Sequence, residues 1–150
     1  LRGDSCPGGL VLFSITFDGP TAFVPERPGG IDDRIFATYH RTMDERITAG
    51  APAGDSRSGR HLLSLLPAAG YRLVEAGASD WVVLPRDAAY RADEGYFLSC
   101  MLGFFEEALS GRPEVSAGEL AAWLTERRHQ LTVGTLGMIV HQLDILARLR

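Results

Sequence analysis

The sequence predicts an α/β fold in which helices cover a buried parallel sheet. Residues 10–17 form an apolar run rich in β-branched and aromatic side chains, between Pro7-Gly8-Gly9 and Asp18-Gly19-Pro20. A short run of this kind between turn signals is typical of a strand buried on both faces, as in parallel sheets. Helical patterns then alternate with further strand patterns along the chain, which is the order expected of an α/β domain.

Composition limits the function classes. The chain has 150 residues, of which 45% are hydrophobic and 23% charged, as in one soluble globular domain or part of one. Its formal net charge is −4, so the chain has no excess of basic residues that could neutralise the phosphates of a nucleic acid. We therefore expect no nucleic-acid partner. No apolar run approaches the roughly 18 to 20 residues of a membrane span, so we expect no membrane partner. Two cysteines, Cys6 and Cys100, predict neither a disulfide framework nor a zinc site, and indicate a cytoplasmic chain.

Two helices are expected after the first strand and a loop at residues 21–30. The first covers residues 32–47, with apolar side chains at four-residue spacing and two aspartates at its positive end. The second covers residues 56–69, with a leucine-rich side, and Gly70 provides a stop signal. Residues 49–55 between them are expected to form a loop.

The second half of the chain is predicted to form a strand, then two helices, and then a strand. Residues 71–76 and 81–84 predict either one bulged strand or a tight hairpin. Residues 92–109 and 116–131 predict helices, and Ser116 with Glu119 predicts a capping box at the start of the second. Residues 135–149 alternate like a strand in their first part and have helical spacing in the rest, and we favour a strand with a short tail.

Several side chains could carry chemistry. His40 and Asp44 are four residues apart on the first helix, which suits a base with its orienting carboxylate or a solvated ion pair. A third ligand is missing, so no metal site is predicted. Residues 55–60, which include Arg57, suit an anion-binding turn or a helix cap. His61, His129 and His141 have no partner in the sequence and predict surface or satisfied core positions.

Three further candidates lie where strands begin or end. Phe17 and Asp18 close the first strand, where ligands bind in open α/β sheets, although turn chemistry also explains an Asp-Gly-Pro sequence. Trp81 could face a pocket or lie in the core. The sequence contains neither GxSxG nor GxxxxGK[ST], so no serine-hydrolase elbow or P-loop is predicted.

The whole chain resembles the C-terminal portion of bacterial class I S-adenosylmethionine-dependent methyltransferases. The resemblance is carried by Pro7-Gly8-Gly9 with residues 10–19, by residues 39–44 and 56–60, by Ser79-Asp80-Trp81 and by residues 141–144. It implies the C-terminal half of a Rossmann-like seven-stranded sheet with an inserted helix pair, starting at the fifth strand and ending on an antiparallel one. It also implies S-adenosylmethionine as cofactor, whose main contacts would lie upstream of Leu1, so no cofactor-binding residue is assigned.

For the intact protein, the resemblance implies methyl transfer to an unidentified small-molecule acceptor, with this chain supplying the substrate side. His40 and Asp44 would then be catalytic, and the substrate would contact Phe17, Asp18, Tyr39, Arg57 and Trp81. The alternative is a non-enzymatic α/β binding or dimerisation module that uses Phe104, Phe105 and Trp123 as its interface. An open apolar strand edge would favour a homodimer in either case.

Overall fold

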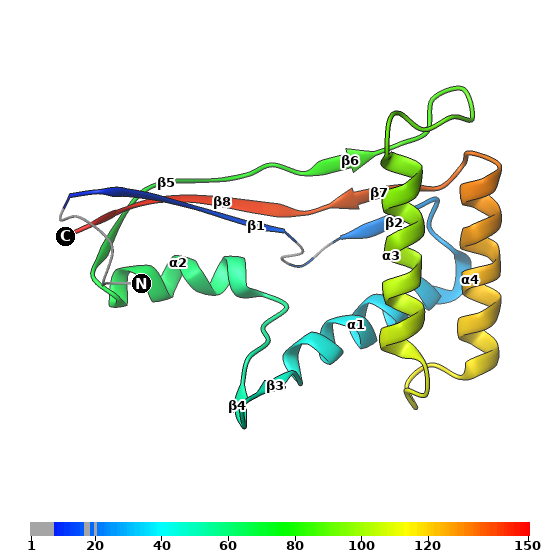
Figure 1. Cartoon of the computed structure of the whole chain (residues 1–150), viewed down its shortest axis with the longest axis horizontal. Coiled ribbons are helices and arrows are strands. Elements are labelled where there is room, and N and C mark those ends of the chain that lie inside the picture. Colours follow the sequence, from blue (N-terminus) through cyan, green and yellow to red (C-terminus); the bar gives the residue numbers. More distant parts are fainter. Residues whose placement is uncertain (1–7, 17–18, 20) are drawn as a thin grey trace. The chain divides into compact units, whose positions relative to one another are not determined.

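The computed structural model describes residues 8–16, 19 and 21–150. Over these residues the chain is a mixed α/β structure with four α-helices and three small antiparallel sheets (Figure 1). The chain forms two compact units. The first unit contains Leu1–Thr21, Ser56–Trp81 and Val140–Arg150, and the second contains Ala22–Asp55 and Val82–Ile139.

A three-stranded sheet organises the first unit. Its order is β1 (Leu10–Thr16), β8 (Gln142–Leu149), β5 (Tyr71–Ala78), and β8 runs antiparallel to both neighbours. Strands β1 and β5 therefore run in the same direction. Helix α2 (Ser58–Ala68) lies between them in the sequence and packs against all three strands.

One face of this sheet is covered and the other is exposed. The covered face packs on α2 around a buried cluster of Leu66, Tyr71, Ile145 and Ala147. On the opposite face Leu10 and Leu12 are 56% and 64% exposed. The side chains of β1 thus alternate between the two environments, as in a half-buried strand.

This arrangement corrects the expectation of a parallel strand buried on both faces. Every pairing of β1 among the described residues is antiparallel, from Leu10 opposite Arg148 to Thr16 opposite Gln142. The density of apolar residues in β1 indicated a strand, but it carried no information on the partner or its direction. The first part of the final stretch forms the expected strand as β7 (Gly137–Val140), but the rest forms a second strand, β8, where a short tail was expected.

Residues 71–84 form neither one bulged strand nor a hairpin. Strand β5 belongs to the first sheet, whereas β6 (Trp81–Val83) belongs to a second sheet of order β2 (Ala22–Val24), β7, β6. The register shift of β5 lies between Leu73 and Glu75, earlier than the predicted interruption.

The second unit is mainly helical. Its elements are η1 (Pro28–Gly30), α1 (Ile31–Asp44), a hairpin of β3 (Ile47–Thr48) and β4 (Ala51–Pro52), α3 (Glu94–Leu109) and α4 (Ala117–Thr132). Helix α1 ends at Asp44, before the predicted residue 47, because the chain turns into the hairpin there. The predicted loop at residues 49–55 contains β4 and the turn of that hairpin.

Helix ends follow local signals only in part. The capping box of α4 is confirmed, since the Glu119 amide donates to Ser116 Oγ at 3.2 Å and the Ser116 amide donates to Glu119 Oε2 at 3.1 Å. Gly70 follows α2 with φ of +90°, which confirms its role as a stop signal. Arg57 occupies the N-cap position of α2 without a side-chain cap hydrogen bond.

An aromatic cluster fills the core of the second unit. The ring of Phe105 lies 5.1 Å from that of Phe36 and 5.7 Å from those of Phe23 and Trp123. Phe105 and Trp123 are fully buried, so the prediction that they form an interface is wrong. Their helices turn these rings inward, and of the three predicted interface residues Phe104 alone is exposed. None of the helices in the described part of the chain combines the length and hydropathy needed to span a lipid bilayer.

Candidate functional site

Polar side chains gather at one end of the first sheet. Because β1 and β5 run in the same direction, their carboxyl ends lie at the same end of the sheet, where the antiparallel β8 begins. Ser14 lies near the end of β1, and Ser79 and Asp80 follow β5. His141 precedes β8, and residues 142–144 are its first three residues. The carboxyl ends of strands are where open α/β sheets bind ligands.

Asp144 is the hydrogen-bonding centre of this group. Its carboxylate accepts hydrogen bonds from Ser14 Oγ at 2.6 Å, from Gln142 Nε2 at 3.1 Å and from Ser79 Oγ. The bonds from Ser14, Ser79 and Gln142 lower the pKa of Asp144, because each favours the ionised form. These three donors are neutral, so none of them cancels the negative charge.

A histidine and a carboxylate pair beside Asp144. Nδ1 of His141 lies 2.8 Å from Oδ1 of Asp80, and the two side chains are 21% and 44% exposed. An ionised carboxylate only accepts hydrogen bonds, so the hydrogen of a neutral imidazole is placed on Nδ1. The lone pair of Nε2 is then available to accept a proton, as in other histidine–carboxylate pairs.

Neighbouring hydrogen bonds hold both members of the pair in place. The Ser79 amide donates to the Gln142 carbonyl at 3.1 Å, and Gln142 Nε2 donates to Ser79 Oγ at 3.2 Å. The His141 amide donates to Oγ1 of the buried Thr21 at 3.3 Å. The segments that carry Asp80 and His141 are therefore fixed by main-chain and side-chain contacts, which is how a preorganised site is supported.

Sequence reasoning missed this pair because its members are 61 residues apart. The charged residue nearest to His141 in the sequence is Asp144, which is bonded to Ser14 and Ser79 instead. A signal was nevertheless available, since Asp80 directly precedes the predicted strand of residues 81–84 and both residues lie in segments that carry the family resemblance.

The predicted substrate residues of the first unit have different surroundings. Phe17 and Asp18 lie outside the described residues. Trp81 is 45% exposed, so the alternative of a core position is wrong, and Arg57 is exposed at the start of α2. The guanidinium of Arg60 lies beside Gly19, which follows β1, because a Cβ at that glycine would lie 2.1 Å from Nη2.

Tyr39, His40 and Asp44 belong to the second unit, so the structure does not gather the predicted residues in one unit. Tyr39 stacks on Phe105 with ring centroids 4.2 Å apart, and burial raises the pKa of its hydroxyl. It also lines a cavity of about 360 Å³ with Met43 of α1, with Arg46, which follows that helix, and with residues of α3. The His40 ring lies 6.3 Å from that of Phe36, whereas Asp44 is exposed at the end of α1.

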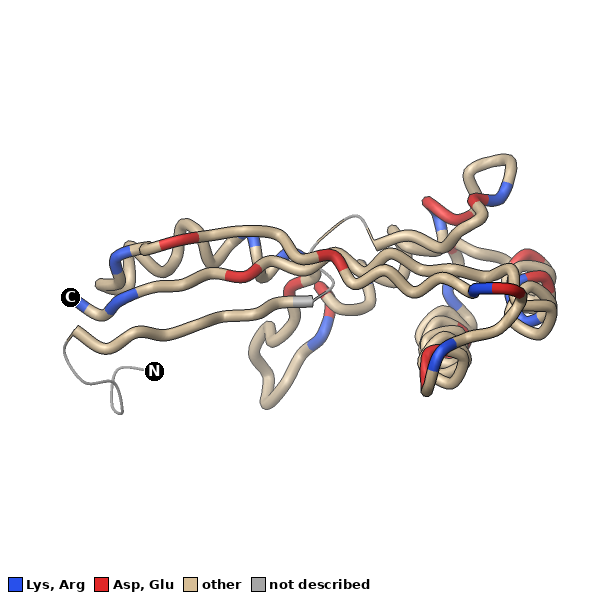
Figure 2. Tube along the Cα trace, turned by 90° about the horizontal axis from the view of Figure 1, so that it is seen from above, with Lys and Arg blue, Asp and Glu red and all other residues tan. Residues whose placement is uncertain are grey.

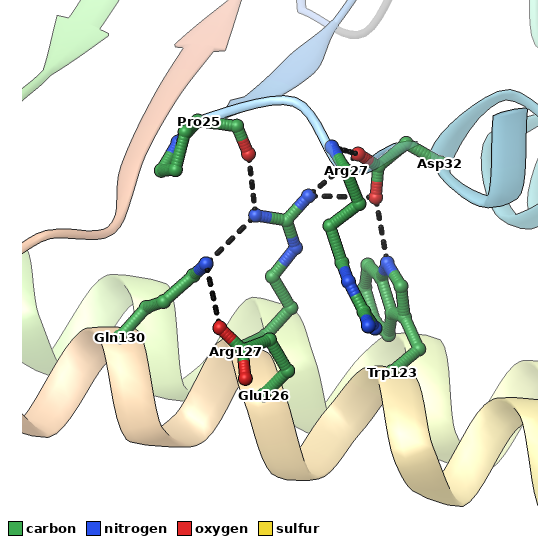
Figure 3. Close-up of polar contacts among 7 residues, drawn as sticks. All are labelled: Pro25, Arg27, Asp32, Trp123, Glu126, Arg127 and Gln130. Atoms are coloured by element: carbon green, nitrogen blue, oxygen red, sulfur yellow. Dashed lines mark hydrogen bonds and ion pairs between the residues drawn. The ribbon is translucent and has the colours of Figure 1, made fainter. Parts of the chain in front are cut away.

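A second carboxylate centre lies inside the second unit (Figure 3). Nη2 of the fully buried Arg127 donates to both oxygens of Asp32 at 2.6 Å. Trp123 Nε1 and the Arg27 amide each donate to Asp32 at 2.7 Å. Arg127 Nη1 also donates to the Pro25 carbonyl at 2.7 Å. Burial raises the pKa of Asp32, but hydrogen bonds from Trp123, Arg127 and the Arg27 amide outweigh it and lower the pKa.

The Asp32 centre is structural. Both oxygens of the carboxylate are occupied by protein donors, and the arginine cancels its charge. The sequence indicated only that Asp32 suits the positive end of α1, because Arg127 lies 95 residues away. Among the described residues, no group of three or more His, Cys, Asp or Glu side chains could hold a metal ion.

The described residues of the first unit form no glycine-rich cradle of the kind that the resemblance implies for S-adenosylmethionine. The sequence contains no GxGxxG-like segment. In the first unit the described glycines with positive φ are Gly8, Gly19 and Gly70, which lie in three separate turns rather than in one cradle. Comparison with known proteins adds no assignment, since no protein-family model and no curated protein matches the chain.

Proposed function

We propose that this chain forms the acceptor side of a class I S-adenosylmethionine-dependent methyltransferase. The observation that supports the proposal is the first sheet, in which the last strand of the chain lies antiparallel between two strands of common direction. The resemblance implies such an ending, with an antiparallel final strand on an otherwise parallel sheet. Doubly wound α/β folds often carry one antiparallel strand of this kind.

The free edge of β1 agrees with the proposed seven-stranded, Rossmann-like sheet. Among the described residues β1 pairs with β8 alone, so its other edge can accept a further strand. Strand β1 carries no charged residue, as its uniformly tan tube in Figure 2 illustrates. The exposed Leu10 and Leu12 would be covered once neighbouring elements pack on this face.

In this proposal the acceptor lies at the carboxyl ends of β1 and β5. A sulfonium is already an activated methyl donor, so the protein contributes positioning and exclusion of water. The residues of this chain that would position the acceptor are Asp144, Arg60 and the Asp80–His141 pair. We place the protein in the cytoplasm, with a small molecule as its acceptor and without a nucleic-acid or membrane partner.

His40 and Asp44 are the sequence-based candidates for the catalytic base. If they act in catalysis, His40→Ala lowers turnover of the intact enzyme roughly 10²- to 10⁴-fold and leaves cofactor affinity unchanged. The position of His40 beside Phe36 favours a packing role instead. We therefore expect His40→Ala to lower the melting temperature, while the enzyme that remains folded keeps its turnover.

The proposal is tested with the intact open reading frame and with the 150-residue chain. We expect the intact protein to bind S-adenosylmethionine in isothermal titration and to transfer labelled methyl groups to small molecules. The chain alone should bind no S-adenosylmethionine. Micromolar binding by the chain alone, or no binding by the intact protein, contradicts the proposal.

A non-enzymatic dimerisation module is the second candidate, and the exposed edge and face of β1 favour it. We expect sedimentation of the chain alone to show dimers or larger species, and Leu12→Lys to reduce them. Leu65→Lys is the matched control, because Leu65 is similarly exposed but lies on α2. If the intact protein is monomeric, the edge is an internal pairing site. If the intact protein keeps a dimer that Leu12→Lys breaks, the module is the better description.

A further inference from the structure

We propose that His141, oriented by Asp80, accepts the proton of a hydroxyl group on the methyl acceptor, so that the acceptor is an alcohol or a phenol. This inference rests on the proposed function and names both a catalytic residue and the class of substrate. Neither the composition nor the motifs of the sequence assign this role to His141.

The first support is the geometry of the pair. The distance of 2.8 Å between His141 Nδ1 and Asp80 Oδ1 is that of a charge-assisted hydrogen bond. The contact fixes the ring orientation and leaves Nε2 as the accepting nitrogen. The His141 side chain is 21% exposed, so a ligand at the strand ends can approach the ring.

The second support is the way in which Asp80 is held. The preceding residue, Ser79, is tied to β8 by its amide and by its hydroxyl, which bonds to Gln142 and Asp144. A carboxylate on such a fixed segment presents one orientation to the imidazole. Asp80 is therefore a positioning residue, and it also balances the positive charge that His141 acquires.

The substrate class follows from the chemistry of a base. A neutral amine attacks through its own lone pair, whereas a hydroxyl gains strong nucleophilicity only when it loses its proton. In the proposed step the O–H bond of the acceptor breaks, its electron pair stays on oxygen, and the proton forms an N–H bond at Nε2. The imidazolium later releases this proton to water. A histidine–carboxylate pair at the acceptor site is thus suited to hydroxyl acceptors.

The probe is 4-nitrophenol, because its ionised form absorbs visible light and reports proton transfer without the methyl donor. At neutral pH we expect the intact protein to raise the phenolate absorbance of the probe. His141→Gln should abolish this rise, since glutamine can keep a hydrogen bond to Asp80 but cannot take the proton. His129→Ala is the control, because His129 is exposed near the end of α4, and it should behave like the wild type.

Nitrogen NMR of the imidazole tests the tautomer independently of any ligand. We expect His141 of the wild type to carry its hydrogen on Nδ1, and Asp80→Asn to shift the tautomer population towards hydrogen on Nε2. Asp80→Asn should also lower the phenolate absorbance band of 4-nitrophenol. An unchanged band in a folded His141→Gln variant, no band with the wild type, or an Nε2–H wild type overturns the inference. Failure of the proposed function appears separately, as the absence of S-adenosylmethionine binding by the intact protein.

Discussion

The two carboxylate centres of this protein differ in how their charge is balanced. Asp32 in the second unit is buried, and Arg127 neutralises it through both of its oxygens. Asp144 in the first unit is partly exposed and is bonded to Ser14, Ser79 and Gln142, which are neutral. Hydrogen bonds lower the pKa of both groups, so both are ionised near neutral pH.

This difference separates a group that holds the fold together from one that is available for chemistry. A buried carboxylate whose charge is cancelled by an arginine is shielded from any ligand. An exposed carboxylate that is bonded to neutral donors keeps its negative charge, and this charge can attract or orient a ligand beside it. A lowered pKa alone therefore does not identify a functional site, and the nature of the partners decides the question.

The largest loss of stability is expected when the buried Asp32–Arg127 pair is broken. Arg127→Met removes the partner of a buried charge, which costs about 3–5 kcal/mol of unfolding free energy. The matched control is Arg128→Met on the same helix, because the Arg128–Glu106 pair is exposed and such pairs contribute little. Urea denaturation measures both variants. Equal losses would show that burial does not distinguish the two arginines.

A smaller loss of stability is expected when acid protonates Asp32. The pKa of Asp32 is lower in the folded protein than its ordinary value of 3.8, so its contribution to stability is complete above that value. The contribution is lost as the pH falls through the lowered pKa. Asp32→Asn should remove this part of the acid sensitivity in melting experiments between about pH 5 and pH 2. Asp33→Asn, at the exposed neighbouring position, should keep the wild-type profile.

The smallest effect on stability is expected at Asp144. Asp144→Asn retains one oxygen acceptor and leaves no buried charge behind, so the melting temperature should stay close to that of the wild type. The hydrogen bond between Ser79 Oγ and residue 144 should weaken, and hydrogen exchange of the Ser79 amide should therefore become faster. A loss of stability as large as that of Arg127→Met would erase the distinction between the two centres.

The parts of the fold that local sequence determines were predictable. The apolar spacing of α3 and the capping box of α4 are encoded within a few residues, and both helices lie close to their expected bounds. The partner of β1 was not predictable, because hydrophobicity indicates that a strand is buried but not what it pairs with. The outward-facing Leu10 and Leu12 made this strand resemble one that is covered on both faces.

The candidate site shows the same limit. Asp80 and His141 meet only because β5 and β8 are neighbours, and nothing in the sequence around either residue encodes that pairing. The Asp32–Arg127 pair depends in the same way on the packing of α4 near the start of α1. Side chains that local sequence can pair, such as His40 and Asp44, lie on one helix and were therefore favoured in the prediction.

The pairing of β1 with β8 also affects synthesis of the protein. Ser14 and its partner Asp144 are 130 residues apart, and at ribosomal elongation rates of about 5–20 residues per second this separation takes on the order of 10 s to translate. During that interval the uncharged β1 segment leaves the ribosome without β8. Chaperones that bind extended apolar segments would meet β1 during this time. The rate at which the first sheet reaches its native pairing is then limited by the arrival of β8.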